Sequence, residues 1–85
     1  MFRVEWTRAA QNELAAIWTR SDSSKRTAVT RAAHRIDQVL SSNPLDAGES
    51  RVGDERIFHE SPLGILFVVD DAGRTAYVFH VWDFD

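Results

Sequence analysis

The sequence predicts a small α+β domain with the element order β-α-α-β-β-β, in which an antiparallel sheet carries a two-helix hairpin on one face. Three observations lead to this fold class. Residues 2–6 alternate between apolar and charged side chains, which is the period of a half-buried strand. Two stretches with apolar residues at helical spacing follow. Three β-like segments then end the chain, separated only by short breaks rich in turn residues.

The first strand and the first helix are expected within residues 2–20. In FRVEW, residues 2–6, large apolar side chains lie on one side and charged ones on the other. Thr7 then occupies the position of an N-cap, where a side-chain oxygen accepts a hydrogen bond from a backbone N–H. The helix itself is RAAQNELAAIWTR, residues 8–20, and its apolar face is formed by Ala10, Leu14, Ile17 and Trp18.

A second amphipathic helix follows SDSS, residues 21–24, which breaks the helical pattern and offers capping hydroxyls. Asn43-Pro44 ends this helix, because the residue before a proline avoids helical backbone angles. Residues 45–54 are polar and contain two glycines, as a surface connection does. The apolar face of the second helix is formed by Val29, Ala32, Ala33, Ile36, Val39 and Leu40.

The three remaining strands are expected at residues 55–60, 65–70 and 75–82. The breaks SPLG and DAGR are short enough to make neighbouring strands antiparallel. Two helices with one apolar face each must cover the sheet, and a helical hairpin most simply covers one side of it. The other side is then open, although residues 65–69 and 76–82 are apolar on both faces, so that periodicity alone does not decide which face meets the helices.

Composition narrows the class of protein. We expect one domain over residues 1–85, with 44% apolar and 27% charged residues, as in ordinary globular proteins. No apolar run approaches the roughly 20 residues that span a bilayer, and the N-terminus lacks a signal-peptide core, so we expect a cytoplasmic protein without membrane association. The chain has no cysteine, which removes disulfides and thiolate chemistry. A net charge of −3 argues against a protein built mainly to grip phosphates.

Three segments resemble the RelE/ParE superfamily of bacterial toxins when taken in order: VEWTRAAQNELAAIW, RIDQVLSSNPL and ERIFHESPLGILFVVDDAGRTAYVFHVWDF. The resemblance covers nearly the whole chain and is closer to the ParE-like branch, whose "Leu-His" run is read here as VFHVW. Members are the toxin halves of type II toxin-antitoxin pairs, with two N-terminal helices on one face of a small antiparallel sheet. One branch cleaves messenger RNA on the ribosome, whereas the ParE branch blocks DNA gyrase without being a nuclease.

This resemblance implies the toxin of a type II toxin-antitoxin, or plasmid stabilisation, system that is neutralised by a cognate antitoxin protein. The implied target is DNA gyrase or the ribosome with its mRNA, and a homodimer is an open alternative. It implies no cofactor and no metal. Two other readings stay open: a ribosome-dependent mRNA endonuclease of the RelE type, and a non-toxic interaction module that keeps the scaffold.

The resemblance also assigns the two faces of the sheet. Phe67, Val69, Phe79 and Val81, with Tyr77, are expected to pack on the helices, opposite Leu14, Ile17, Ile36 and Leu40. The open side is expected to carry Arg56, Phe58, Leu66, Val68, Val78, His80 and Trp82.

A ribonuclease of this kind needs a group that activates the ribose 2′-hydroxyl, an acid for the leaving oxygen and cations for the transition state. Arg56, for phosphate charge, and His80, for proton transfer, are the candidate catalytic residues. Arg51 and Arg56 are the candidates for binding a target or nucleic acid, and Glu49 or Arg51 approximates the charged positions just before the second strand.

The departures from the ribonuclease pattern favour binding over cleavage. Gly64 and Val68 fall where that branch has basic residues, and Asp83 and Phe84 fall where it has a His or Tyr pair. No pair of histidines has metal-ligand spacing on one element. The carboxylates near the last turn and the C-terminus are expected to be solvated surface; they are Asp70, Asp71, Asp83 and Asp85.

Several apolar side chains on the open side are expected to form one patch: Phe58, Leu66, Val68 and Trp82. A contiguous exposed apolar patch usually marks a binding surface, whereas single exposed apolar residues do not. We therefore predict that these residues bind a partner, with Trp82 as the anchor.

Overall fold

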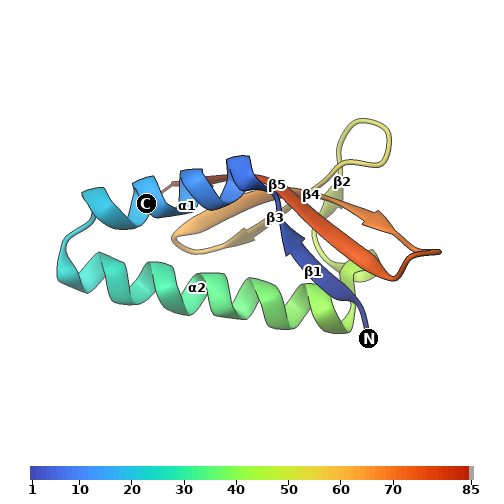
Figure 1. Cartoon of the computed structure of the whole chain (residues 1–85), viewed down its shortest axis with the longest axis horizontal. Helices are drawn as coiled ribbons and strands as arrows, with labels where there is room; N and C mark the ends of the chain where they lie inside the picture. The colour runs from blue at the N-terminus through green and yellow to red at the C-terminus, as the bar shows by residue number, and fades with distance from the viewer. Residues whose placement is uncertain (85) are drawn as a thin grey trace.

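A computed structural model describes residues 1–84 and contains two helices and one five-stranded sheet. The helices form an antiparallel hairpin beside the sheet (Figure 1). The elements are β1 (Arg3–Trp6), α1 (Arg8–Arg20), α2 (Ser23–Ser42), a 3₁₀ turn η1 (Pro44–Asp46), β2 (Glu49–Ser50), β3 (Arg56–Glu60), β4 (Leu63–Asp70) and β5 (Thr75–Asp83). The predicted α+β class and the order of its main elements are confirmed.

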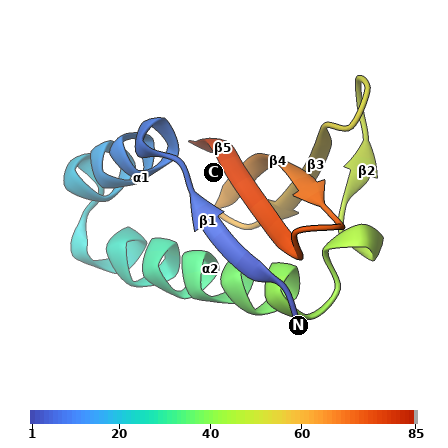
Figure 2. The ribbon, with the colours of Figure 1, turned by 45° about the vertical axis from the view of Figure 1, so that its right-hand side comes forward.

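The strands are ordered β1-β5-β4-β3-β2. β3, β4 and β5 are antiparallel neighbours, as the short turns between them predict. β1, however, runs parallel to β5, with Arg3 opposite Thr75 and Trp6 opposite Val78. Figure 2 shows these two strands side by side. The sheet is therefore mixed rather than wholly antiparallel. Parallel neighbours need a crossover connection, and the two helices and three strands between β1 and β5 supply it here.

Both helices begin at the side chains that the sequence predicts or permits as caps. The Thr7 hydroxyl accepts a hydrogen bond from the N–H of Ala10 (3.2 Å), and the Asp22 carboxylate accepts one from the N–H of Lys25 (2.8 Å). α2 ends immediately before Asn43-Pro44, as expected. The start of α1 and the end of α2 therefore lie where local signals predict them, whereas the cap of α2 is a carboxylate rather than the expected hydroxyl.

The core lies between the helical hairpin and one face of the sheet. Ile17, Ile36 and Leu40 from the helices are buried against Ile65 and Phe67 of β4. The predicted helix face is therefore confirmed, with Leu14 and Val69 packing at its margin.

A β-bulge in β5 changes which of its residues face the helices. Leu66 pairs with His80 while Phe67 pairs with Val78, so β5 has one extra residue between these pairs. As a result Val78 and Val81 are both buried in the core although they are three residues apart. Phe79 is half-buried outside the core, and Tyr77 is 38% exposed. The predictions that Tyr77 and Phe79 face the helices and that Val78 lies on the open side are wrong.

The register of β3 corrects two further predictions. Phe58 pairs with Ile65 and Arg56 pairs with Phe67, and residues directly opposite each other in an antiparallel pair share one face. Both β4 residues are fully buried against the helices. Arg56 and Phe58 therefore lie on the helix side of the sheet rather than on the open side.

Candidate functional site

The open face of the sheet is formed by side chains that point away from the helices. Leu66 and Val68 of β4 are half-buried there and alternate along the strand with the fully buried Ile65 and Phe67. The pairing of Leu66 with His80 and of Gly64 with Trp82 places both β5 residues on the same side. The predicted positions of these four side chains are confirmed. The open face comprises Ile57, His59, Leu66, Val68, Tyr77, His80 and Trp82.

Trp82 lies directly over Gly64. A Cβ atom at Gly64 would stand 2.5 Å from Cε2 and Cζ2 of the indole, which is closer than real contacts allow. His59 flanks Gly64 on β3, and its ring meets Trp82 edge-on at 6.0 Å between centroids. The absence of a side chain at Gly64 thus creates room for the Trp82 ring. An indole thus covers the position that the resemblance aligns with a basic residue of the ribonucleases.

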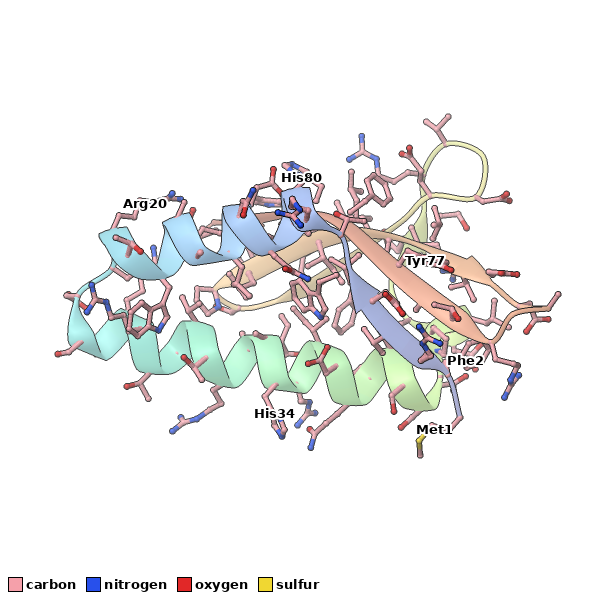
Figure 3. All side chains as sticks on the ribbon, viewed as in Figure 1. Met1, Phe2, Arg20, His34, Tyr77 and His80 are labelled. Atoms are coloured by element: carbon pink, nitrogen blue, oxygen red, sulfur yellow. The ribbon has the colours of Figure 1, made fainter. Side chains whose placement is uncertain are left out.

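Glu13 of α1 connects the first helix to this face. Its Oε2 lies 2.8 Å from Nδ1 of His80, and its Oε1 accepts a hydrogen bond from the N–H of Val81 (2.9 Å). An ionised carboxylate only accepts hydrogen bonds, so a neutral His80 donates from Nδ1 and has Nε2 unprotonated. In Figure 3 His80 lies beside α1. Sequence reasoning missed Glu13, because its partner is 67 positions away along the chain.

The two predicted catalytic residues do not come together. Arg56 and His80 pair with neighbouring residues of β4, Phe67 and Leu66, and therefore lie on opposite faces. The guanidinium of Arg56 donates to the carbonyl of Ala47 (3.1 Å), which ties β3 to the segment before β2.

The predicted target-binding residue Arg51 also lies apart from His80. It is exposed after β2, in the turn that leads to β3, and its backbone N–H donates to the Glu55 carbonyl (2.8 Å). The described residues thus bring no arginine of the prediction next to the histidine.

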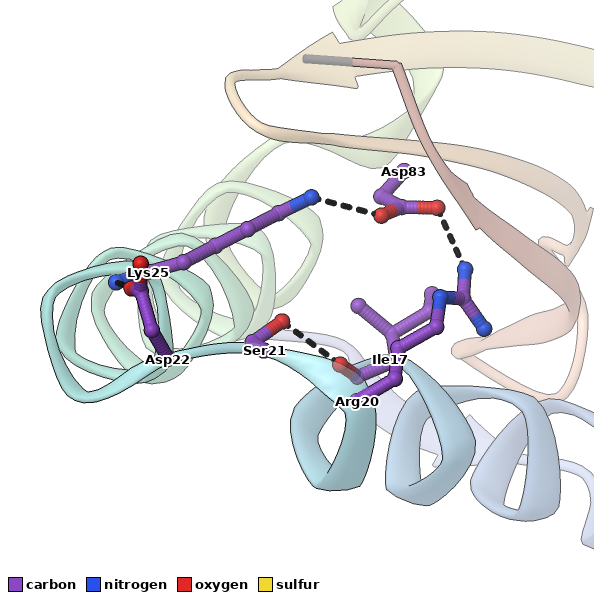
Figure 4. A network of polar contacts seen from close by, with 6 residues as sticks. All are labelled: Ile17, Arg20, Ser21, Asp22, Lys25 and Asp83. Carbon is purple, nitrogen blue, oxygen red and sulfur yellow. Dashed lines mark hydrogen bonds and ion pairs between the residues drawn. The ribbon is translucent and has the colours of Figure 1, made fainter.

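Asp83 joins the end of β5 to both helices (Figure 4). One carboxylate oxygen pairs with the Arg20 guanidinium at 2.6 Å, and the other pairs with the Lys25 ammonium at 2.7 Å. The hydrogen bond from Lys25, with help from Arg20, lowers the pKa of Asp83 below its usual value. Asp83 is therefore a tie between elements rather than the solvated carboxylate that the sequence predicted. Asp85, the last of that group, lies outside the described residues.

A hollow of about 550 Å³ lies between the outer sides of α1 and α2 and was not expected from the sequence. Its lining includes Trp6, Leu14, Trp18, Val29, Ala33 and Asp37. The indole N–H of Trp6 donates to the Asp37 carboxylate (2.7 Å), so that β1 is fastened to α2 at its edge. Trp18 is 43% exposed at this hollow, so the prediction that it belongs to the buried apolar face of the first helix is wrong.

Residues 1–84 contain no group of three histidine or carboxylate side chains placed to hold a metal ion. Neither described helix combines the length and the apolar character needed to cross a membrane.

This architecture is the fold of the RelE and ParE toxins. The chain matches a chain of a chromosomal ParDE toxin-antitoxin system from P. aeruginosa with a TM-score of 0.78 and 22% identity, over 100% of this chain and 98% of that one. It matches the toxin-antitoxin complex RelBE2 from Mycobacterium tuberculosis at 0.73 and 21%, over 98% and 91%. The isolated E. coli RelE toxin matches at 0.67 and 18%, over 100% and 86%. No family model and no curated protein sequence matches significantly.

Proposed function

We propose that this protein is the toxin of a type II toxin-antitoxin system, that a protein antitoxin restrains it, and that it acts by binding its target. The fold supports the system, because its neighbours come from ParDE and RelBE toxin-antitoxin pairs and match over nearly their whole length. The observation that carries the mode of action is the indole of Trp82 over Gly64, where a nuclease of this fold needs a cation. In this proposal Leu66, Val68 and Trp82 contact the target protein, and DNA gyrase is the target to test first. The protein works in the cytoplasm.

Expression in a bacterial host tests this proposal. Inducing the chain alone should arrest growth, and co-expressing the product of a small neighbouring reading frame should restore growth and yield a complex that purifies together. Unchanged growth on induction of the folded protein would contradict the toxin assignment. Gyrase supercoiling activity, measured with and without the purified chain, tests the target separately.

One observation favours a second function, cleavage of ribosome-bound mRNA. The carboxylate of Glu13 orients His80 as a second group orients a general base in many enzymes, and in a neutral ring this contact leaves Nε2 as the acceptor. In that function His80 takes the proton of a ribose 2′-hydroxyl. Because cations to stabilise the phosphate charge are scarce on this face, we expect no cleavage of mRNA on purified ribosomes. Cleavage by the parent that is lost in His80→Ala would establish the second function.

A further inference from the structure

We propose that the open face docks a basic, amphipathic segment of the partner protein. This inference deepens the docking role proposed above and rests on it, because it states the chemistry of the segment that covers Leu66, Val68 and Trp82. It is carried by the distribution of charge over the two layers and by the carboxylates that border the apolar side chains of this face.

The charges of the chain are divided unevenly between its layers. Residues 8–42, which include both helices, carry six Arg or Lys and three Asp or Glu. The rest of the chain, which includes all five strands, carries four basic and ten acidic residues. Not all of these acidic residues face the open side, since Glu60 and Asp83 both pair with Leu63 and share the helix side. The negative charge of the open face therefore comes from the carboxylates at its rim.

Carboxylates without a cationic partner stand at two ends of the open face. Glu49 of β2 pairs with Ile57 and shares its face, and Asp70 follows Val68 by two residues along β4. Within residues 1–84 neither carboxylate forms an ion pair, and Asp70 accepts only the N–H of Gly73 (3.0 Å). On β1, the carboxylate of Glu5 is paired with Arg3, so these two residues add no net charge.

This arrangement suits lysine and arginine side chains. Their aliphatic stems pack on apolar surface while their charged ends reach the rim, and cations are also attracted to the faces of Trp and Tyr rings. An RNA backbone or an acidic helix would bring negative charge against Glu49 and Asp70 instead. A second copy of the chain would have to present its basic helices to this face, which self-association measurements can detect.

The test uses the intact, ¹⁵N-labelled protein and two short helical peptides with the same leucine and alanine face. One peptide has lysine at every polar position and the other has glutamate. In NMR titrations at low salt we expect the lysine peptide to shift the Trp82 indole signal and the amides of Leu66 and Val68. The glutamate peptide should bind at least about tenfold more weakly, and added salt should weaken the lysine peptide because exposed charges are screened.

Matched charge reversals locate the effect. Glu49→Lys should weaken the lysine peptide several-fold, whereas Asp54→Lys, which makes the same charge change in the turn after β2, should weaken it less. Dispersed amide signals will show that each variant is folded.

Equal binding of the two peptides, absence of binding, or shifts confined to the helix amides would overturn the proposal. So would the same shifts on adding a single-stranded RNA oligonucleotide, or on raising the protein concentration alone. Growth arrest without lysine-peptide docking would reject this inference and keep the toxin assignment. Docking without growth arrest would reject the toxin assignment and leave the chemistry of the surface standing.

Discussion

A missing side chain shapes the open face at the scale of single residues. Gly64 lies in the middle of the row His59, Gly64 and Trp82, which crosses three strands. Because Gly64 has no Cβ, the Trp82 indole lies on its backbone and reaches the His59 ring, while the His80 ring lies 5.2 Å away on the other side. Trp82 is thus positioned by its neighbours before any partner binds.

Gly64→Ala should displace this indole. The added Cβ would meet the ring at 2.5 Å, and overpacking of this kind costs about 1–3 kcal/mol of unfolding free energy. Urea denaturation measures the cost, and the Trp82 indole N–H signal reports the displacement. Gly53→Ala is the control, since its φ of +59° costs about 1 kcal/mol but no atom lies within 4 Å of the new Cβ. An unmoved indole signal in Gly64→Ala would contradict the packing described.

The two phenylalanines of the central strands should differ strongly. Phe67 is fully buried, so truncating it to Ala should cost about 3–5 kcal/mol. Phe79 lies at the bulge outside the core, and Phe79→Ala should cost only about 1 kcal/mol. The measurement compares the midpoints of urea unfolding. It requires that the variants keep the parent's dependence of unfolding free energy on urea concentration. Equal losses would place Phe79 in the core, as strict alternation predicts.

At the scale of elements, carboxylates from one element satisfy groups on another. β1 pairs only with residues 75–78 of β5, so the N–H of Val81 has no strand partner on that edge. The carboxylate of Glu13 accepts it and so fastens α1 to the unpaired part of β5. This explains how the strand end stays covered without a sixth strand.

Glu13→Ala should loosen this attachment. A buried backbone donor left without a partner costs about 1–3 kcal/mol of unfolding free energy. The Glu13 side chain is partly exposed, so we expect a loss near the lower end of this range. The sharper readout is hydrogen exchange at the Val81 amide, which should become faster while the amide of Phe67 stays protected. Asn12→Ala, a neighbouring exposed residue whose side chain makes no hydrogen bond within residues 1–84, is the control. Unchanged exchange at Val81 would show that the carboxylate contributes nothing to this edge.

The Asp83 tie predicts a pH dependence of definite sign. Lys25 and Arg20 lower the pKa of Asp83 in the folded protein, so its stabilising effect is present above the unfolded pKa and is lost as pH falls through the lower folded value. Asp83→Asn should therefore cost about 1 kcal/mol near neutral pH and almost nothing in strong acid. Urea midpoints of parent and variant across the acid range measure this. A difference that is constant with pH would exclude the charge as its cause.

The sequence predicts elements better than it predicts their pairing. Thr7 and the helical spacing of Ile17, Ile36 and Leu40 act within a few positions, and each was predicted correctly. The predicted break SPLG was too long, because its Leu63 and Gly64 belong to β4. The bulge next to Phe79 and the parallel partner of β1 depend on strands that meet only in the folded chain. Strict alternation along β5 therefore predicted Tyr77 on the helix side and Val78 on the open side, which is the reverse of their positions in the structure. The candidate site shares this limit: Leu66, Val68, His80 and Trp82 were placed correctly, whereas Arg56 and Phe58 were not.

At the scale of the whole molecule, two surfaces compete for the role of binding site. The helical layer carries more Arg and Lys than Asp and Glu, and the hollow between its helices is lined in part by Trp18, which is 43% exposed and lies under the Arg26 guanidinium at 4.3 Å. The open face of the sheet is apolar with an acidic rim. The helical surface presents the exposed Trp18 and the open face presents Trp82, so the chain itself offers a matched pair of truncations.

Trp82→Ala should abolish growth arrest, or weaken binding to a purified target by about 2 kcal/mol, because large aromatic side chains dominate binding hot spots. Trp18→Ala removes a ring of the same size from the opposite layer and should leave both properties near the parent level. Urea denaturation separates lost function from lost folding, and both variants should stay folded because neither ring belongs to the buried core. The assignment of the open face as the binding surface requires that Trp82→Ala have the larger effect of the two. If Trp18→Ala abolishes the arrest and Trp82→Ala does not, the hollow between the helices is the surface that meets the target, and the sheet face must have another occupant.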